Sequence, residues 1–165
     1  MLINNMQPNN DNQNNPFQYF TSRAKEAFKK AHELAIERGQ NSVNTMHMMA
    51  AIVTMDDSVV YSMLEHMGVD LGLFVDTVLD NIDMRGGSNT LAPSYQMYMT
   101  GELARSIDES LKIAHTLHDE FVSTEHLFLG LMDADGDMLD LMKKFKIDRD
   151  IAMKTLEGLR NSTDV

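Results

Sequence analysis

Two related stretches decide the fold of this chain. The later one reads Asp119-Glu-Phe-Val-Ser-Thr-Glu-His-Leu-Phe-Leu-Gly-Leu-Met132, and the earlier one reads Ser42-Val-Asn-Thr-Met-His-Met-Met-Ala-Ala-Ile-Val53. In the later stretch Ser123 or Thr124 can cap a helix, because a hydroxyl there accepts a hydrogen bond from an unpaired helical N–H. Glu125 then falls in the first turn, where a carboxylate favours the positive end of the helix dipole. The stretch therefore predicts a loop followed by a capped, apolar helix.

The earlier stretch repeats this design at a fixed distance. Three residues recur 79 positions later (126 − 47): Val43, Thr45 and His47 return as Val122, Thr124 and His126. The helix before each stretch repeats as well. Thr21 and Thr100 each stand at the start of a segment that has one apolar helical face. Near the end of each copy Gly68-Val-Asp70 matches Lys146-Ile-Asp148 at an offset of 78 (148 − 70), so one residue was lost in between.

The pattern predicts an all-α fold, with eight helices as two pseudo-twofold four-helix repeats in one globular domain. Repeat one spans about 20–82, residues 83–95 form a linker with Gly86, Gly87 and Pro93, and repeat two spans about 99–160. Residues 1–16 are rich in Asn and Gln and are expected to be a disordered tail, and residues 161–165 are expected to begin a linker. No segment alternates apolar and polar residues as a half-buried strand would, so no sheet is expected.

Composition excludes several functional classes. A net charge of −11 argues against a general nucleic-acid binder, because phosphate recognition needs clustered Lys and Arg. The same charge either attracts basic or unfolded cationic segments or keeps the domain in solution. There is no cysteine for a disulfide or a zinc–thiolate site, and no apolar run of transmembrane length or basic–apolar signal peptide. We expect a cytoplasmic protein without a membrane partner.

Two groups of residues resemble metal sites. Asp133-Ala-Asp-Gly-Asp137 has carboxylates at alternate positions, but its glycine and the expected final Glu are misplaced for a calcium loop, so we interpret it as a helix-capping turn. His115 and His118 lie three residues apart on a helix and could bind a transition metal only if two further ligands converged. Surface histidines near the end of a helix are the favoured interpretation.

The recurring His47 and His126 are interpreted as structural, each bonding to its neighbouring loop. Phosphate-loop, nucleophile-elbow and dinucleotide-binding motifs do not occur in the sequence. Nothing assembles a nucleophile, a base and an orienting group. We predict that this chain is not an enzyme and binds no cofactor or metal.

The repeated residues resemble the N-terminal domain of the Clp AAA+ unfoldases, with the ClpB and ClpC branches most similar. The resemblance covers about residues 17–160, and the stretches that carry it are 20–27, 35–39, 44–48 and 119–127: Phe-Thr-Ser-Arg-Ala-Lys-Glu-Ala, Ala-Ile-Glu-Arg-Gly, Asn-Thr-Met-His-Met and Asp-Glu-Phe-Val-Ser-Thr-Glu-His-Leu. It implies a substrate- and adaptor-recruiting domain tethered ahead of an ATPase ring. The parent would be a hexamer whose ATP and Mg²⁺ bind in modules that are absent from these 165 residues.

The resemblance also implies where a client binds. Family positions that engage unfolded or aggregated polypeptide in ClpB-like domains match Thr21, Asp119 and Glu125. In ClpC-like domains a Thr-Glu pair in each repeat helps to bind phosphoarginine, and adaptor proteins dock nearby. Here Thr124-Glu125 is present, but the first pair reads Thr45-Met46 and lacks its carboxylate. A guanidinium needs a carboxylate partner, so at most one such site is expected.

Three hypotheses remain open from the sequence. The leading one is the recruiting domain of a cytoplasmic Clp unfoldase, with Thr21, Asp119, Thr124 and Glu125 as binding residues. The second is a free-standing accessory protein that docks on a Clp protease or unfoldase. The third is a small metal-dependent enzyme that uses His115, His118 and nearby acids.

Overall fold

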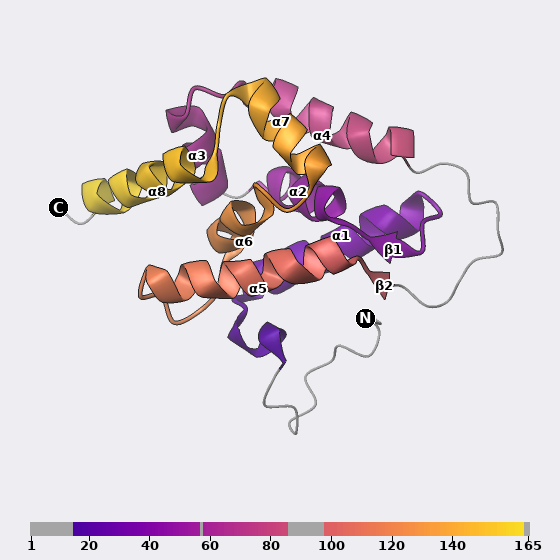
Figure 1. Ribbon diagram of the computed structural model, residues 1–165, viewed down its shortest axis with the longest axis horizontal. Coiled ribbons are helices and arrows are strands. Elements are labelled where there is room, and N and C mark those ends of the chain that lie inside the picture. The colour runs from indigo at the N-terminus through magenta and orange to yellow at the C-terminus, as the bar shows by residue number, and fades with distance from the viewer. Residues whose placement is uncertain (1–14, 57, 86–97, 164–165) are drawn as a thin grey trace.

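The computed structural model describes residues 15–56, 58–85 and 98–163, which form eight α-helices with two very short strands (Figure 1). In chain order the elements are η2 (Pro16–Tyr19), α1 (Ser22–Glu37), β1 (Ser42–Val43), α2 (Thr45–Thr54), α3 (Ser58–His66), α4 (Leu71–Arg85), β2 (Tyr98–Met99), α5 (Gly101–Thr116), α6 (Thr124–Leu131), α7 (Gly136–Phe145) and α8 (Arg149–Thr163). The predicted all-α fold is confirmed.

Helix α1 shows how local sequence fixes an element. It begins after Thr21, whose hydroxyl accepts a hydrogen bond from the N–H of Ala24, and it ends before Gly39, which adopts φ +68°. Glycine takes this left-handed conformation without a steric penalty. The buried face is made mostly of alanine, at positions 24, 27, 31 and 35. Small side chains let α1 and α2 pack closely, as Figure 1 shows.

Helices α2 and α6 occupy the middle of the fold and pack against each other. Each is also covered by the first helix of its own repeat, α1 over α2 and α5 over α6. All residues from Thr45 to Val53 are buried, and α6 is buried throughout except at Glu125. These helices are apolar all round, which is typical of core helices. Within the part of the chain that the structure describes, no helix combines the length and apolar character that crossing a bilayer requires.

The two repeats exchange backbone hydrogen bonds. Strand β1 of repeat one pairs in parallel with β2 of repeat two, and Phe20 forms an isolated parallel bridge with Val122. The N–H of Thr100 donates to Val43 O at 3.0 Å, and the N–H of Thr21 donates to Val122 O at 2.9 Å. Both donors and both acceptors are 79 residues apart (100 − 21 and 122 − 43). The second contact is therefore the first with the repeats interchanged, as a pseudo-twofold requires.

The expectation of no sheet was wrong at these two strands. Each strand has only two residues, so neither can show an alternating pattern, and each is held by a partner more than fifty positions away. The outer helices also pack across the repeats: α3 lies against α8, and the rings of Phe74 in α4 and Phe145 in α7 meet edge to face at 4.9 Å. Neither four-helix repeat is a self-contained unit.

The structure shifts the predicted boundaries slightly. Residues 83–85 belong to α4, not to the linker, and α8 continues to Thr163, past the predicted start of the final linker at 161. Pro16 begins η2, capped by Asn15, so the predicted tail is shorter than 1–16. The predicted disorder of residues 1–14 and the remainder of the linker, 86–95, lie outside the described residues, as do 164–165.

Candidate functional site

The start of α6 is organised around a buried histidine. Ser123 is the N-cap, and its N–H donates to Nδ1 of His126 at 2.8 Å. Because Nδ1 accepts this bond, the ring proton lies on Nε2. That proton points to Asp119, whose Oδ2 is 2.7 Å from Nε2. The structural role predicted for His126 is confirmed, and the ring also fixes a carboxylate at the helix start.

Asp119 has a second hydrogen-bond partner, the guanidinium of Arg160 from the last turn of α8. Nη1 lies 3.2 Å from Oδ1 and Nη2 lies 2.8 Å from Oδ2, which is the two-pronged geometry that favours arginine over lysine. Partial burial on its own would raise the pKa of Asp119, but the hydrogen bonds from Arg160 and His126 and the charge of Arg160 lower it below 3.8. Asp119 is therefore ionised at neutral pH.

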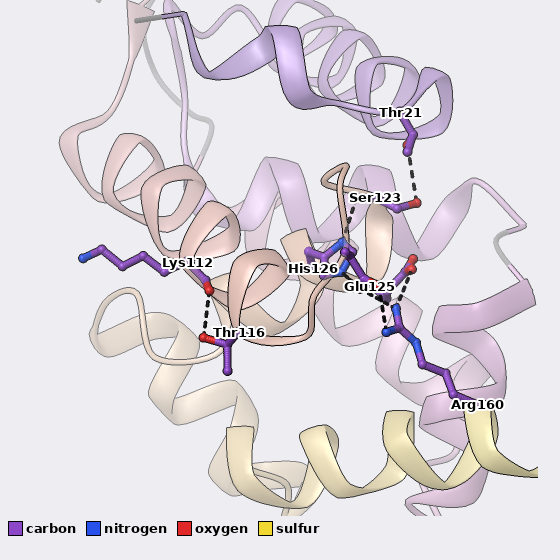
Figure 2. Close-up of polar contacts among 8 residues, drawn as sticks. Thr21, Lys112, Thr116, Ser123, Glu125, His126 and Arg160 are labelled. Carbon is purple, nitrogen blue, oxygen red and sulfur yellow. Dashed lines mark hydrogen bonds and ion pairs between the residues drawn. The ribbon is translucent and has the colours of Figure 1, made fainter.

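Glu125 brings a second carboxylate to the same guanidinium. Its Oε1 lies 3.6 Å from Nη2 of Arg160, and its side chain is only 14% exposed. Figure 2 shows Arg160 reaching from α8 toward Glu125 and His126. We call Asp119 and Glu125 the acid pair. With Arg160 included and His126 neutral, the group carries a formal charge of −1.

The threonines predicted for the site occupy different environments. Thr21 lies at the start of α1, and its hydroxyl donates to Ser123 Oγ at 3.4 Å, so the first turn of repeat one adjoins the N-cap of α6 (Figure 2). Thr124 is 1% exposed and is part of the core. The structure thus brings the four predicted residues to one place. It leaves Thr21 and the acid pair partly accessible, while Thr124 is buried.

Two exposed aromatic side chains belong to residues next to the Phe20–Val122 bridge. We call this contact between the repeats the seam. Tyr19 and Phe121 are 48% and 49% exposed, and the N–H of Val122 donates to Tyr19 O at 2.7 Å. Tyr19 precedes the bridge residue Phe20, and Phe121 precedes Val122. Exposed aromatic rings on the same segments as Thr21 and Asp119 suit a polypeptide ligand that carries both apolar and cationic groups.

Comparison with known proteins identifies the family of the chain. A sequence profile described as "Clp repeat (R) N-terminal domain" matches residues 19–145. The chain belongs to this family. It is 25% identical over 146 residues to the protein named "Chaperone protein ClpB" of Bacillus anthracis, a match that covers 88% of this chain but only 17% of that protein.

Solved structures share the fold of this Clp N-terminal domain. The crystal structure of the Hsp104 N-terminal domain from Candida albicans superposes with a TM-score of 0.74 at 20% identity, covering 87% of this chain and 92% of that one. A structure described as the "Complex of ClpV N-domain with VipB peptide" gives a TM-score of 0.64 at 16% identity, covering 87% and 88%. At these identities the likeness concerns the fold alone.

Sequence reasoning missed Arg160, the residue that joins the acid pair. The repeat alignment contains a signal for it. At the offsets of 79 and 78 residues, Asp119, Glu125 and Arg160 align with Gln40, Met46 and Ile82 (119 − 79, 125 − 79 and 160 − 78). Repeat two has a charge at each of three positions that are neutral in repeat one. These charges of opposite sign, which only repeat two carries, are the signal from which an ion pair could have been predicted.

The metal-site alternatives gain no support from the described residues. The acidic turn caps α7 as predicted: Asp135 accepts from the N–H of Met138 at 2.9 Å, and Asp133 pairs with Arg149 at 2.5 Å. His115 and His118 are exposed at the end of α5. Across residues 15–56, 58–85 and 98–163, no three His, Cys, Asp or Glu side chains are grouped to hold a metal ion.

A concavity lies on repeat two, with a lining that does not include the acid pair. It has a volume of about 270 Å³ and is lined by residues that include Arg105, Glu109, Asp133 and Arg149. Arg149 bridges the two acids, at 2.7 Å from Glu109 and 2.5 Å from Asp133. Its charges are thus largely compensated within the protein, in contrast to the acid pair.

Proposed function

We propose that this Clp N-terminal domain recruits unfolded or aggregated polypeptides, and the adaptors that deliver them, for an AAA+ unfoldase ring. In this proposal the parent is a cytoplasmic hexamer that binds ATP and Mg²⁺ in other modules. The client contacts Thr21, Asp119 and Glu125, and Thr124 positions Glu125 from the core. The observation that carries the proposal is the partly open acid pair, with exposed Tyr19 and Phe121 two residues from Thr21 and Asp119 at the seam of the repeats.

The chemistry of the seam favours a mixed ligand. The carboxylates offer charge-assisted hydrogen bonds to a cationic side chain, and the aromatic rings offer apolar surface. Unfolded segments expose both kinds of group, whereas folded proteins bury most of the apolar ones. The peptide complex of the ClpV N-domain supports the proposal, because that domain has the same fold.

A phosphoarginine-marked client is a narrower version of the same proposal. Only repeat two carries the Thr-Glu pair, because Met46 replaces the carboxylate in repeat one and is 2% exposed. One marked arginine would therefore bind per domain.

The test measures the affinity of the chain for fluorescent, reduced and carboxymethylated α-lactalbumin, which is permanently unfolded. Glu125→Gln and Asp119→Asn remove one charge each, and each is expected to weaken binding about tenfold, the loss of one charge-assisted hydrogen bond. A matched control is Glu102→Gln, because Glu102 is the second residue of α5 as Glu125 is of α6, and it also lies 3.6 Å from an arginine, Arg105.

The outcomes separate the parts of the proposal. If the unmutated chain does not bind the unfolded protein, recruitment is wrong. If it binds and both acid variants bind as tightly as the unmutated chain, the acid pair is the wrong site. Circular dichroism melts ensure that Asp119→Asn is folded at the assay temperature.

A further inference from the structure

We propose that Arg160 is an internal occupant of the acid pair and that an arginine side chain of the client displaces it. This inference rests on the proposed function and names both the ligand group and the regulation of the same site. Its basis is that a guanidinium already lies between the two carboxylates, donating to Asp119 and approaching Glu125.

The geometry of Arg160 defines what the site accepts. Two guanidinium nitrogens face the two oxygens of Asp119, at 3.2 and 2.8 Å, and Nη2 also reaches Glu125. A lysine ammonium is a point charge and does not match both oxygens in this way. The ligand class is therefore a guanidinium, and an incoming arginine would reproduce bonds that the protein already makes with its own.

Arg160 is placed where release is easy. It lies in the last turn of α8, beyond Leu156, the last side chain of the helix that is fully buried, and it is 35% exposed. Terminal turns open more readily than helix interiors, so the guanidinium can leave the acid pair when the last turn of α8 opens. When Arg160 leaves, the acid pair has a charge of −2 in place of −1, which strengthens its attraction for a cation.

A client arginine gains contacts that Arg160 does not have. Residues flanking it in an unfolded segment can cover Tyr19 and Phe121, which are about half exposed. A free arginine without apolar neighbours would lack this advantage. The arrangement thus favours arginines in apolar surroundings, which folded proteins seldom display.

The second arginine of α8 shows the contrasting design and supplies the control. Arg149 is the first residue of the helix and bridges Glu109 and Asp133 at 2.7 and 2.5 Å. It clamps α8 to α5 and to the turn before α7. Replacing Arg149 removes a comparable set of ion pairs from the same helix without touching the acid pair.

The experiment compares the unmutated chain, Arg160→Gln, Arg149→Gln and Glu125→Gln. The probe is a fluorescent twelve-residue peptide with one arginine among leucines and phenylalanines, measured beside a second peptide with neutral citrulline in its place. The apparent dissociation constant equals the intrinsic one divided by the fraction of open sites, so an acid pair that is occupied most of the time gives Arg160→Gln about fivefold tighter binding of the arginine peptide. Arg149→Gln should bind like the unmutated chain, Glu125→Gln more weakly, and the citrulline peptide should not distinguish Arg160→Gln from the unmutated chain.

Weaker or unchanged binding of the arginine peptide by Arg160→Gln would overturn the inference, because Arg160 would then organise the acid pair or have no effect on it. Equal tightening for both peptides would also overturn it, since the gain would not depend on a guanidinium. The α-lactalbumin measurement keeps this result separate from the proposed function. Glu125-dependent binding of that protein without tightening in Arg160→Gln removes only the internal occupant, whereas no binding at all removes the recruiting role.

Discussion

The starts of α2 and α6 share one capping arrangement. In α2 the N–H of Asn44 donates to Nδ1 of His47 at 3.0 Å, and in α6 the N–H of Ser123 donates to Nδ1 of His126 at 2.8 Å. Both histidines are buried. In each repeat a buried histidine therefore satisfies the N-cap N–H through Nδ1, whatever else the repeat does.

The surroundings of the two rings differ. Nε2 of His126 donates to Asp119, whereas Nε2 of His47 has no hydrogen-bond partner among the described residues. Burial and the nearby charge of Arg38 lower the pKa of His47 to about 4. The same scaffold thus keeps a neutral histidine in repeat one and anchors a network of charges in repeat two. The comparison separates what the fold requires from what the second repeat adds.

A second contrast concerns how the first two helices of each repeat pack. Ala27, Ala31 and Ala51 of repeat one align with Ser106, Ser110 and Gly130 of repeat two (106 − 79, 110 − 79 and 130 − 79). The serine hydroxyls bond within α5, with Ser110 Oγ 2.8 Å from Ser106 O. These hydroxyls fit against α6 because Gly130 has no Cβ.

We expect the largest loss of stability from Gly130→Ala, which gives repeat two the alanine that repeat one has at this contact. In Gly130→Ala the new Cβ would overlap Ser110 Oγ and would lie 2.7 Å from the backbone oxygen of Ser106. Because a backbone oxygen cannot rotate away, we expect the free energy of unfolding in urea to fall by about 3 kcal/mol.

The double variant Gly130→Ala/Ser110→Ala sharpens this prediction. It removes one of the two overlaps and should recover part of the lost stability. If Gly130→Ala does not lower the free energy of unfolding, α5 and α6 have room for a Cβ. The proposed contrast with the alanine contacts of α1 and α2 is then wrong.

The second prediction uses the neutral histidine of repeat one. The unfolded chain binds a proton at His47 near pH 6.5, whereas the folded chain does so only near pH 4. Between these values the unfolded state binds more protons, so the free energy of unfolding falls as the pH is lowered from 6.5 to 4, by roughly 3 kcal/mol in total. Urea titrations at a series of pH values measure it.

His47→Gln tests the assignment, because glutamine at this position of a helix can still accept from the N-cap N–H but does not titrate. The variant should lose most of the pH dependence between 6.5 and 4, while His126→Gln should retain it. The same slope in all three proteins would place the titrating group elsewhere.

The smallest expected effect concerns the turns after α3 and α7, where repeat one has glycine and repeat two has lysine. Gly68 ends α3 with φ +74°, and its counterpart Lys146 (146 − 78) ends α7 with φ +57°. A residue with a Cβ is strained in this region, so Lys146→Gly should raise the free energy of unfolding by up to about 1 kcal/mol, and Gly68→Lys should lower it by a similar amount. Thermal melts of the two variants would contradict this if both shifted in the same direction.

Much of the fold was predictable because its signals are local. Thr21, Thr100, Asp70 and Asp148 each accept a hydrogen bond from the backbone N–H three residues ahead, which is the local pattern of a helix cap. The capping histidines act over the same distance. Gly39 lies just after the end of α1 with φ +68°, a conformation that glycine favours. Repetition of these signals at a fixed offset was enough to predict two repeats.

The site was predictable only in part, for a physical reason. Thr124 and Glu125 lie in the first turn of a helix that the sequence places by itself, and Thr21 lies at the start of another. How these starts meet depends on strand pairs between residues 56 and 102 positions apart, β1 with β2 and Phe20 with Val122 (98 − 42 and 122 − 20), for which no local pattern exists.

The sequence by itself therefore determined the helices, their caps and the presence of two copies, because each depends on contacts within one or two turns. Only the tertiary structure decided that Arg160 lies between Asp119 and Glu125. That contact joins residues 41 and 35 positions apart (160 − 119 and 160 − 125) and depends on how α8 docks beside α6. Long-range docking turned two separate acids into one guanidinium-binding pair.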